Sequence, residues 1–187
     1  MNPVKSIALL GLCLLAFQSV AQSSATDSNA QVNAANKERL QRGGKMSPRE
    51  RAELAKAERA QGNSQAGADF LAGNRAKPGV VTLGSGVQYK ILQAGTGKKA
   101  TDASSVRVRY TGKLADGSTF DKADDKTPTT LRVAGLVPGL KEAVKLMPAG
   151  SKWEVVIPPQ LAYGARGAHG IAPNAVLIYV IEVVDVV

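Results

Sequence analysis

Cysteine and histidine are almost absent from this sequence, and aromatic residues are few. The chain of 187 residues contains one cysteine, Cys13, and one histidine, His169. The rest of the chain therefore has no thiol nucleophile, disulfide or cysteine-based metal site, and the residues do not form the set expected of a hydrolase triad. We interpret His169 as a solvated loop residue. Because only 4% of the residues are aromatic, the position of each one is informative.

Acidic residues are outnumbered, with 15 Asp and Glu against 24 Lys and Arg, which gives a net charge of +9. The excess is spread along the chain, whereas a nucleic-acid face usually gathers its basic residues on one element. We therefore expect no nucleic-acid partner, and interpret the charge as favouring solubility or weak attraction to anionic envelope surfaces. The sequence also lacks a phosphate-binding glycine loop, and we expect no cofactor and no metal.

An apolar run at residues 7–17 is too short to cross a bilayer, which needs about 20 apolar residues. Lys5 precedes this run, and the small residues of Ser-Val-Ala at 19–21 follow it. That order is typical of a secretory signal peptide over residues 1–21, cleaved near Ala21. We therefore expect a periplasmic or secreted protein without stable membrane insertion.

A membrane anchor and a lipoprotein are the alternatives at this end of the chain. Lipid attachment at Cys13 requires a small residue before the cysteine, and Leu12 does not fit that position. Cleavage near Ala21 would leave a mature chain without cysteine, which suits an oxidising compartment.

The next segments have a polar composition. Residues 22–46 are rich in Ser, Ala, Asn and Gln, and we expect a disordered tether there. Residues 47–80 are predicted to be a helical N-terminal segment that starts with a capping box between Ser47 and Glu50. The helix buries little apolar surface, so it is either solvated or a spacer, and Gly62-Asn63 is a candidate break or bend.

Residues 81–187 have the pattern of short strands with one helix. Apolar and polar residues alternate over 106–114, a helical pattern covers 139–147, and a nearly continuous β-branched run covers 175–187. We expect that last run to be a central strand with both faces covered. The sequence predicts an α+β fold of several antiparallel strands and one short helix, preceded by an N-terminal helical extension.

Three stretches of residues 81–187 resemble the FKBP family of peptidylprolyl cis-trans isomerases, in particular its exported bacterial group that includes macrophage infectivity potentiators. Residues 108–121 match the family's Tyr-Thr-Gly and Gly-x-x-Phe-Asp signature. Residues 136–143 match its Val-Ile-Pro-Gly-Trp-x-Glu-Ala segment, and 157–164 match its Ile-Pro-Pro-x-Leu-Ala-Tyr-Gly segment. Their order and spacing also agree, so residues 81–187 are expected to be an isomerase domain. The resemblance implies that its antiparallel sheet is curved into a half-barrel and wraps around one short helix.

The resemblance implies an apolar pocket that binds proline-containing segments of unfolded or exported proteins. It implies a catalytic set and a substrate-binding set: Tyr110, Phe120, Asp121, Val137 and Tyr163 in the first, and Leu136, Leu140, Ile171 and Tyr179 in the second. From its residue type alone, Asp121 is better interpreted as a turn residue that accepts local backbone hydrogen bonds, and the motif match reverses this preference.

The sequence departs from the family at three positions. Leu140 replaces the usual Trp of the pocket floor, Thr129 stands where an aromatic residue is common, and Tyr179 replaces Phe. These departures imply altered substrate preference and weaker binding of macrolide inhibitors such as rapamycin. They also leave open an alternative function, a proline-segment binding module or chaperone with little catalysis. Because the helical segment is short compared with that of dimeric relatives, we expect a monomer.

Overall fold

A computed structural model describes residues 47–123, 127–168 and 170–187. The chain divides after Leu54 into two units. The predictions for the signal peptide, the tether and His169 lie outside the described residues.

Helix α2, Pro48–Arg75, begins with the predicted capping box. The Ser47 backbone N–H donates to the Glu50 carboxylate at 2.7 Å, and the Glu50 N–H donates to Ser47 Oγ at 3.2 Å. These two bonds satisfy donors that the first turn of a helix leaves unpaired. The capping box explains why the helix begins at Pro48.

α2 runs through Gly62 and Asn63 without interruption, so the predicted break does not occur. Asparagine lowers helix stability because its side chain competes for nearby backbone groups. Here the Asn63 amide is instead used by a distant partner, because it donates to the Pro173 carbonyl at 2.8 Å. Of the described residues of α2, only Gly67 and Asn74 are buried, which agrees with its polar composition.

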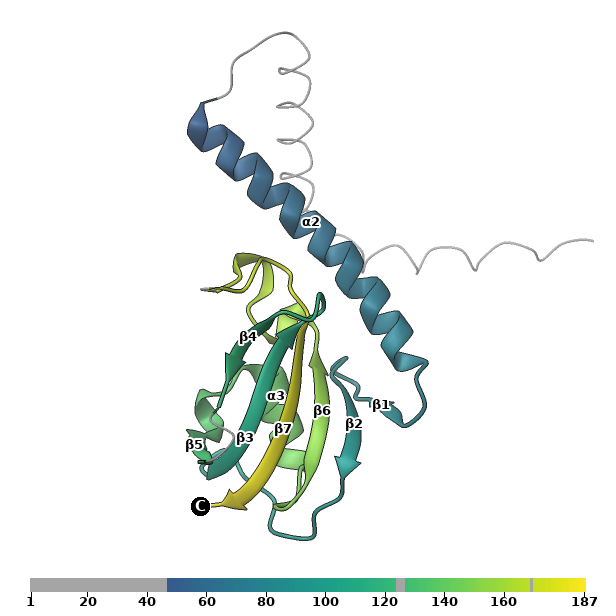
Figure 1. The fold of residues 1–187 in the computed structure, drawn as a ribbon, viewed down its shortest axis with the longest axis vertical. Coiled ribbons are helices and arrows are strands. Elements are labelled where there is room, and N and C mark those ends of the chain that lie inside the picture. Colours follow the sequence, from purple (N-terminus) through teal and green to yellow (C-terminus); the bar gives the residue numbers. More distant parts are fainter. Residues whose placement is uncertain (1–46, 124–126, 169) are drawn as a thin grey trace, which may run out of the picture. The chain divides into compact units, whose positions relative to one another are not determined.

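In the described part of the chain, seven strands form one antiparallel sheet, in the order β1-β2-β6-β7-β3-β4, with β5 also paired to β3 (Figure 1). β4 and β5 pair with different halves of β3 and so share its outer edge. The strands are β1 Val80–Thr82, β2 Gln88–Gln93, β3 Ser105–Leu114, β4 Thr119–Lys122, β5 Thr129–Arg132, β6 Lys152–Ile157 and β7 Leu177–Val186.

β7 lies in the middle of the sheet, between β3 and β6, as the β-branched run predicts. Its residues alternate between buried and partly exposed from Leu177 to Val184. The expectation of two covered faces is therefore correct for the inner face and only partly correct for the outer face. The outer positions include Glu182, which pairs with Arg109 of β3 at 3.1 Å.

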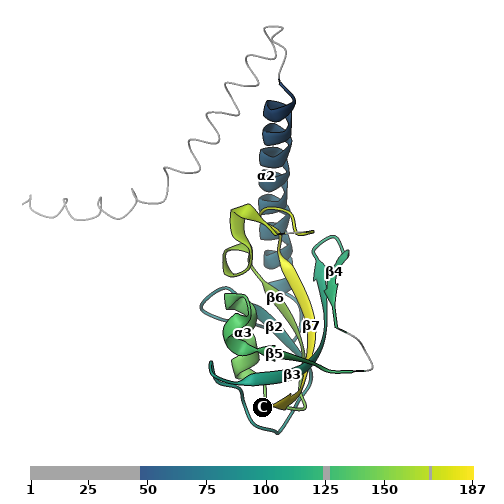
Figure 2. The same ribbon diagram turned by 90° about the vertical axis from the view of Figure 1, so that its left-hand side faces the viewer.

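Helix α3, Pro138–Leu146, packs against the inner face of the curved sheet (Figure 2). Leu140, Ala143 and Val144 form its buried face, and Met147 follows at the C-cap with no exposed surface. Burying apolar side chains between helix and sheet is the dominant favourable contribution to folding. The arrangement confirms the predicted α+β fold with a sheet wrapped around one short helix. Among the described residues, no helix combines the length and apolar character needed to span a bilayer.

Candidate active site

Three aromatic rings from adjacent strands meet on the inner face of the sheet. The ring centroids of Tyr110 on β3 and Tyr179 on β7 lie 6.0 Å apart, and Phe120 on β4 meets Tyr179 edge to face at 5.5 Å. β4 and β7 flank β3, so strand pairing brings the rings together. Edge-to-face contacts are a preferred geometry for aromatic pairs. Tyr179 is buried, whereas Tyr110 and Phe120 are half-buried and can contact a bound molecule.

Gly112, to which the sequence analysis assigned no role, makes room for the Phe120 ring. It lies on β3, paired with Asp121 on one side and Tyr179 on the other. A Cβ atom at this position would lie 2.7 Å from the tip of the Phe120 ring, which is closer than a real carbon contact. The Phe120 ring therefore lies directly over the backbone of Gly112. The signal in the sequence is a glycine inside an otherwise regular strand, which often marks a close approach.

The Tyr110 hydroxyl donates a hydrogen bond to Asp121 Oδ2 at 2.9 Å. The Asp121 side chain thus bonds a residue of the neighbouring strand, which differs from the turn interpretation. The pKa of Tyr110 is raised from its usual 10.0 to about 12, first by burial and then by the hydrogen bond and negative charge of Asp121. Tyr110 therefore keeps its proton, and the hydrogen bond holds the Asp121 carboxylate in place.

The raised pKa of Tyr110 predicts a loss of stability in alkali. Above pH 10 the unfolded chain gives up the Tyr110 proton while the folded protein keeps it until about pH 12, so the free energy of unfolding falls across this range. Below pH 10 both states are protonated and this contribution is constant. In Tyr110→Phe the decline between pH 10 and 12 should be shallower, as measured by urea unfolding at each pH. An equally steep decline in the variant would contradict the prediction.

Tyr163 lies in the loop between β6 and β7 and is 39% exposed. Within the part of the chain that the structure describes, no hydrogen bond uses its hydroxyl group. The pKa of Tyr179 is raised by burial, and further by the nearby Tyr163, Asp121 and Tyr110, each of which disfavours another negative charge there. The hydroxyl groups of these three tyrosines and the Asp121 carboxylate therefore lie within electrostatic reach of one another.

The start of α3 contributes an unpaired backbone donor. Val137 is the N-cap, Pro138 occupies the first turn, and the Val137 carbonyl accepts the Lys141 N–H at 2.9 Å. No described residue accepts a hydrogen bond from the Val137 N–H, as is normal for the first amides of a helix. The N-terminal end of a helix also carries a partial positive charge. This donor suits a carbonyl oxygen of a bound peptide.

The nine predicted site residues fall into two groups. Five of them interact with one another through ring contacts, the hydrogen bond between Tyr110 and Asp121, or electrostatic interactions. The other four belong to the hydrophobic core or pack against it. The first group is Tyr110, Phe120, Asp121, Tyr163 and Tyr179, and the second is Leu136, Val137, Leu140 and Ile171. Their roles remain predictions.

The positions that depart from the family signature differ in burial. Leu140 is only 5% exposed and belongs to the core, whereas Thr129 is exposed on β5. The ring of the sole tryptophan, Trp153, stacks on Tyr89 with centroids 4.4 Å apart. Trp153 is thus held on β6 by a neighbour outside the predicted site.

The described residues do not provide a set of side chains that could bind a metal ion. Across residues 47–123, 127–168 and 170–187, no group of three or more His, Cys, Asp or Glu side chains could hold a metal ion. The groups at the site that can act on a bound peptide are hydroxyls, a carboxylate, a backbone N–H and apolar surface.

Two family models match the chain. Residues 96–184 match the FKBP-type peptidyl-prolyl cis-trans isomerase model, and residues 10–91 match the domain that lies amino-terminal to such isomerases. The first match contains all nine predicted site residues.

Several known proteins are similar to this chain. The outer membrane protein MIP of Legionella longbeachae is 48% identical over 130 residues, which are 68% of this chain and 56% of that protein. An FKBP-type 22 kDa peptidyl-prolyl cis-trans isomerase of Escherichia coli is 40% identical over 139 residues, covering 73% of this chain and 68% of that protein. The chain thus spans little more than half the length of the first relative and about two thirds of the second.

A solved structure is also similar to the chain. The crystal structure of a peptidyl-prolyl cis-trans isomerase from Pseudomonas syringae matches with a TM-score of 0.64 and 36% identity. The match covers 76% of this chain and 98% of that one. It therefore includes nearly all of a solved isomerase.

Proposed function

Because the chain belongs to the family of FKBP-type peptidyl-prolyl cis-trans isomerases, we propose that it accelerates rotation about X-Pro peptide bonds in unfolded proteins. The observation that carries the proposal is the cluster of Tyr110, Phe120 and Tyr179 rings beside the half-exposed Tyr163. This cluster offers apolar walls and polar groups at one place, as binding sites for small molecules and peptide segments do.

The reaction requires no covalent step. Rotation about a peptide bond has a barrier of about 18–20 kcal/mol because the amide resonance must be lost. The two end states of an X-Pro bond differ by only about 0.5–1 kcal/mol, so the obstacle is kinetic. A catalyst has to bind the twisted amide more tightly than either planar form. Twisting reduces the amide dipole, so an apolar pocket disfavours the twisted amide less than the planar one.

Each polar group has a place in this mechanism. The Tyr163 hydroxyl donates to a carbonyl oxygen of the peptide, and the Val137 N–H donates to another carbonyl oxygen at the start of α3. Asp121, held by Tyr110 at 2.9 Å, orients the carbonyl of the twisted bond. The Phe120 and Tyr179 rings exclude water from the proline ring. Leu136 and Ile171 extend this apolar wall, in keeping with their packing in or against the core.

An isomerisation assay on residues 22–187 tests the proposal directly. The chain should accelerate cis-to-trans conversion of a proline tetrapeptide, and the variant Tyr163→Phe/Asp121→Ala should lower kcat/KM about thirtyfold or more, because one charged and one neutral hydrogen-bonding group are lost. A rate equal to that of buffer for the unmodified chain would refute the proposal. If the same double variant still suppresses client aggregation fully while catalysis is absent, the alternative function of a binding module or chaperone is favoured.

Leu140→Trp is an informative companion variant in the same assay. Leu140 forms a smaller floor than tryptophan, so the pocket is deeper and less flat. The variant should bind a macrolide such as rapamycin more tightly than the unmodified chain, and its preference for the residue before proline should change. If the variant and the unmodified chain have the same macrolide affinity and the same selectivity, Leu140 does not form the pocket floor.

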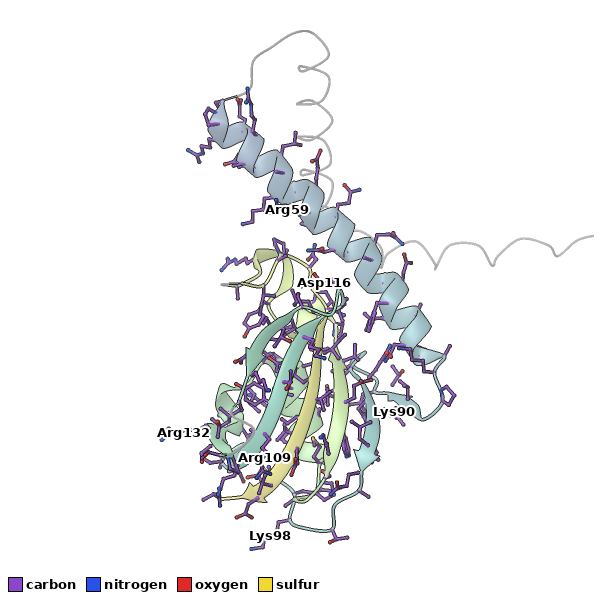
Figure 3. All side chains as sticks on the ribbon, in the orientation of Figure 1. Arg59, Lys90, Lys98, Arg109, Asp116 and Arg132 are labelled. Atoms are coloured by element: carbon purple, nitrogen blue, oxygen red, sulfur yellow. The ribbon has the colours of Figure 1, made fainter. Side chains whose placement is uncertain are left out.

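We place the protein outside the cytoplasm, periplasmic or secreted, after cleavage of a signal peptide near Ala21. A relative called an outer membrane protein and the predicted signal peptide support this location. Its partners are then proline-containing exported proteins. Arg59, Lys90, Arg109 and Arg132 lie on four different elements and Lys98 lies in the loop between β2 and β3 (Figure 3), a distribution that supports the expectation of no nucleic-acid partner. We expect a monomer.

A further inference from the structure

Two asparagines connect α2 to the loop between β6 and β7. Asn63 of α2 donates its side-chain amide to the Pro173 carbonyl at 2.8 Å, and Asn174 of the loop donates its amide to the Ala60 carbonyl at 3.0 Å. Each side of the contact therefore supplies one donor and one acceptor. We call this pair the asparagine clamp. All four residues lie in the second unit of the chain.

The helix and the loop also pack closely next to the asparagine clamp. Gly67 is buried, and a Cβ atom at this position would lie 2.9 Å from Cγ2 of Val176. A larger residue would push the loop away from the helix. The loop leads directly into β7.

Asn174 transmits this contact to the candidate active site. Its backbone has φ = 56°, and no other non-glycine residue of the described ranges has a positive φ. Asparagine tolerates this left-handed conformation better than most residues. In this conformation the Asn174 backbone N–H donates to the Gly164 carbonyl at 2.9 Å. Gly164 follows Tyr163 directly. Asn174 therefore bonds α2 through its side chain and the residue after Tyr163 through its backbone.

We propose that Asn63 and Asn174 are positioning residues that hold Tyr163 in the orientation needed for its hydrogen bond to the peptide. This inference rests on the proposed isomerase function. An exposed loop samples many conformations, and only those that aim the Tyr163 hydroxyl at the peptide allow catalysis. The measured kcat/KM is therefore reduced in proportion to the fraction of molecules in the other conformations. Two hydrogen bonds to the helix raise the fraction of molecules whose loop has the catalytic conformation. α2 thereby contributes to catalysis without touching the substrate.

The variants Asn63→Ala and Asn174→Gly remove the clamp with little other change. Alanine is a good helix former, and glycine accepts a positive φ without strain. Each variant should lower kcat/KM about threefold to tenfold, the range expected for the loss of one neutral hydrogen bond. Gln65→Ala is the matched control, because it removes a bond to Asp69 within the same helix at 3.0 Å and should leave kcat/KM unchanged.

A double-mutant cycle separates positioning from a general structural effect. In a Tyr163→Phe background the hydroxyl is already absent, so the clamp variants should lower kcat/KM much less than in the unmodified chain. An equal loss in both backgrounds would show that the clamp acts on the fold as a whole and would overturn the proposal.

Hydrogen exchange tests the clamp independently of catalysis. In Asn63→Ala the Asn174 backbone N–H should exchange at least about threefold faster, while amides of β7 exchange as before. Unchanged exchange at Asn174 overturns the proposal even if the chain is an active isomerase. Faster exchange in a chain without any isomerase activity would mean that the proposed function, and with it the catalytic role of the clamp, is wrong.

Discussion

Phe120→Ala is expected to lower kcat/KM for a proline peptide at least about thirtyfold, a loss of about 2 kcal/mol in transition-state stabilisation. The Phe120 ring covers Gly112 and meets the Tyr179 ring at 5.5 Å, so its removal opens the aromatic wall to water. Water favours the planar amide with its larger dipole over the twisted one. The expected loss is therefore in kcat as well as in binding.

The stability cost of the same change should be moderate. A fully buried Phe→Ala change costs about 3–5 kcal/mol, but Phe120 is half-buried on an edge strand and loses less. Urea unfolding measures this cost beside the kinetic assay.

Leu131→Ala is the matched control for Phe120→Ala. Leu131 is also half-buried and packs against the core, and it lies on β5, which shares the outer edge of β3 with β4. This variant should lose stability comparably but keep kcat/KM within about twofold, because it lies outside the aromatic cluster. Equal kinetic losses in the two variants would show that Phe120 acts only through the fold.

Gly139→Ala is expected to destabilise the domain by about 1–3 kcal/mol or more, the range for overpacking a core. A Cβ atom at Gly139 would lie 2.4 Å from Cγ2 of Ile157, a fully buried side chain of β6. The gain in helix propensity from glycine to alanine, about 1 kcal/mol, does not offset such a clash. To relieve it, the first turn of α3 has to move away from the sheet.

That movement should also reduce activity, because the same turn carries Val137 and Leu140. Gly135→Ala is a suitable comparison, since no atom lies within 4 Å of the added Cβ and its φ is not positive. It should change the free energy of unfolding by less than about 0.5 kcal/mol. If Gly139→Ala were equally neutral in urea unfolding and in kcat/KM, α3 would not be fixed against β6 as described.

Local patterns were sufficient to predict most of the domain. The alternation from Val106 to Leu114 predicted β3 and its inward face, and the apolar spacing after Gly139 predicted α3. The capping box at Ser47 predicted the first residue of α2. Each of these signals depends on neighbours within a few positions, and this is the range in which sequence periodicity carries information.

Features that depend on distant partners could not be predicted in this way. The helix continues past Asn63, whose side chain bonds Pro173, 110 positions further along the chain. The place of the Phe120 ring over Gly112 depends on the pairing of β3 with β4. The partial exposure of the outer face of β7 depends on what covers the sheet, which no strand pattern specifies. The family and the fold were identified from three short signatures, whereas the roles of the site residues need the assays described above.

The central place of β7 in the sheet has a consequence for how the protein is made. Residues 177–186 supply pairing partners to β3 on one side and β6 on the other, yet they are the last of the seven strands to leave the ribosome. Until they emerge, the two halves of the sheet have no strand to join them, and such long-range pairing is intrinsically slow. The two halves of the sheet therefore cannot join until nearly the whole domain has been synthesised.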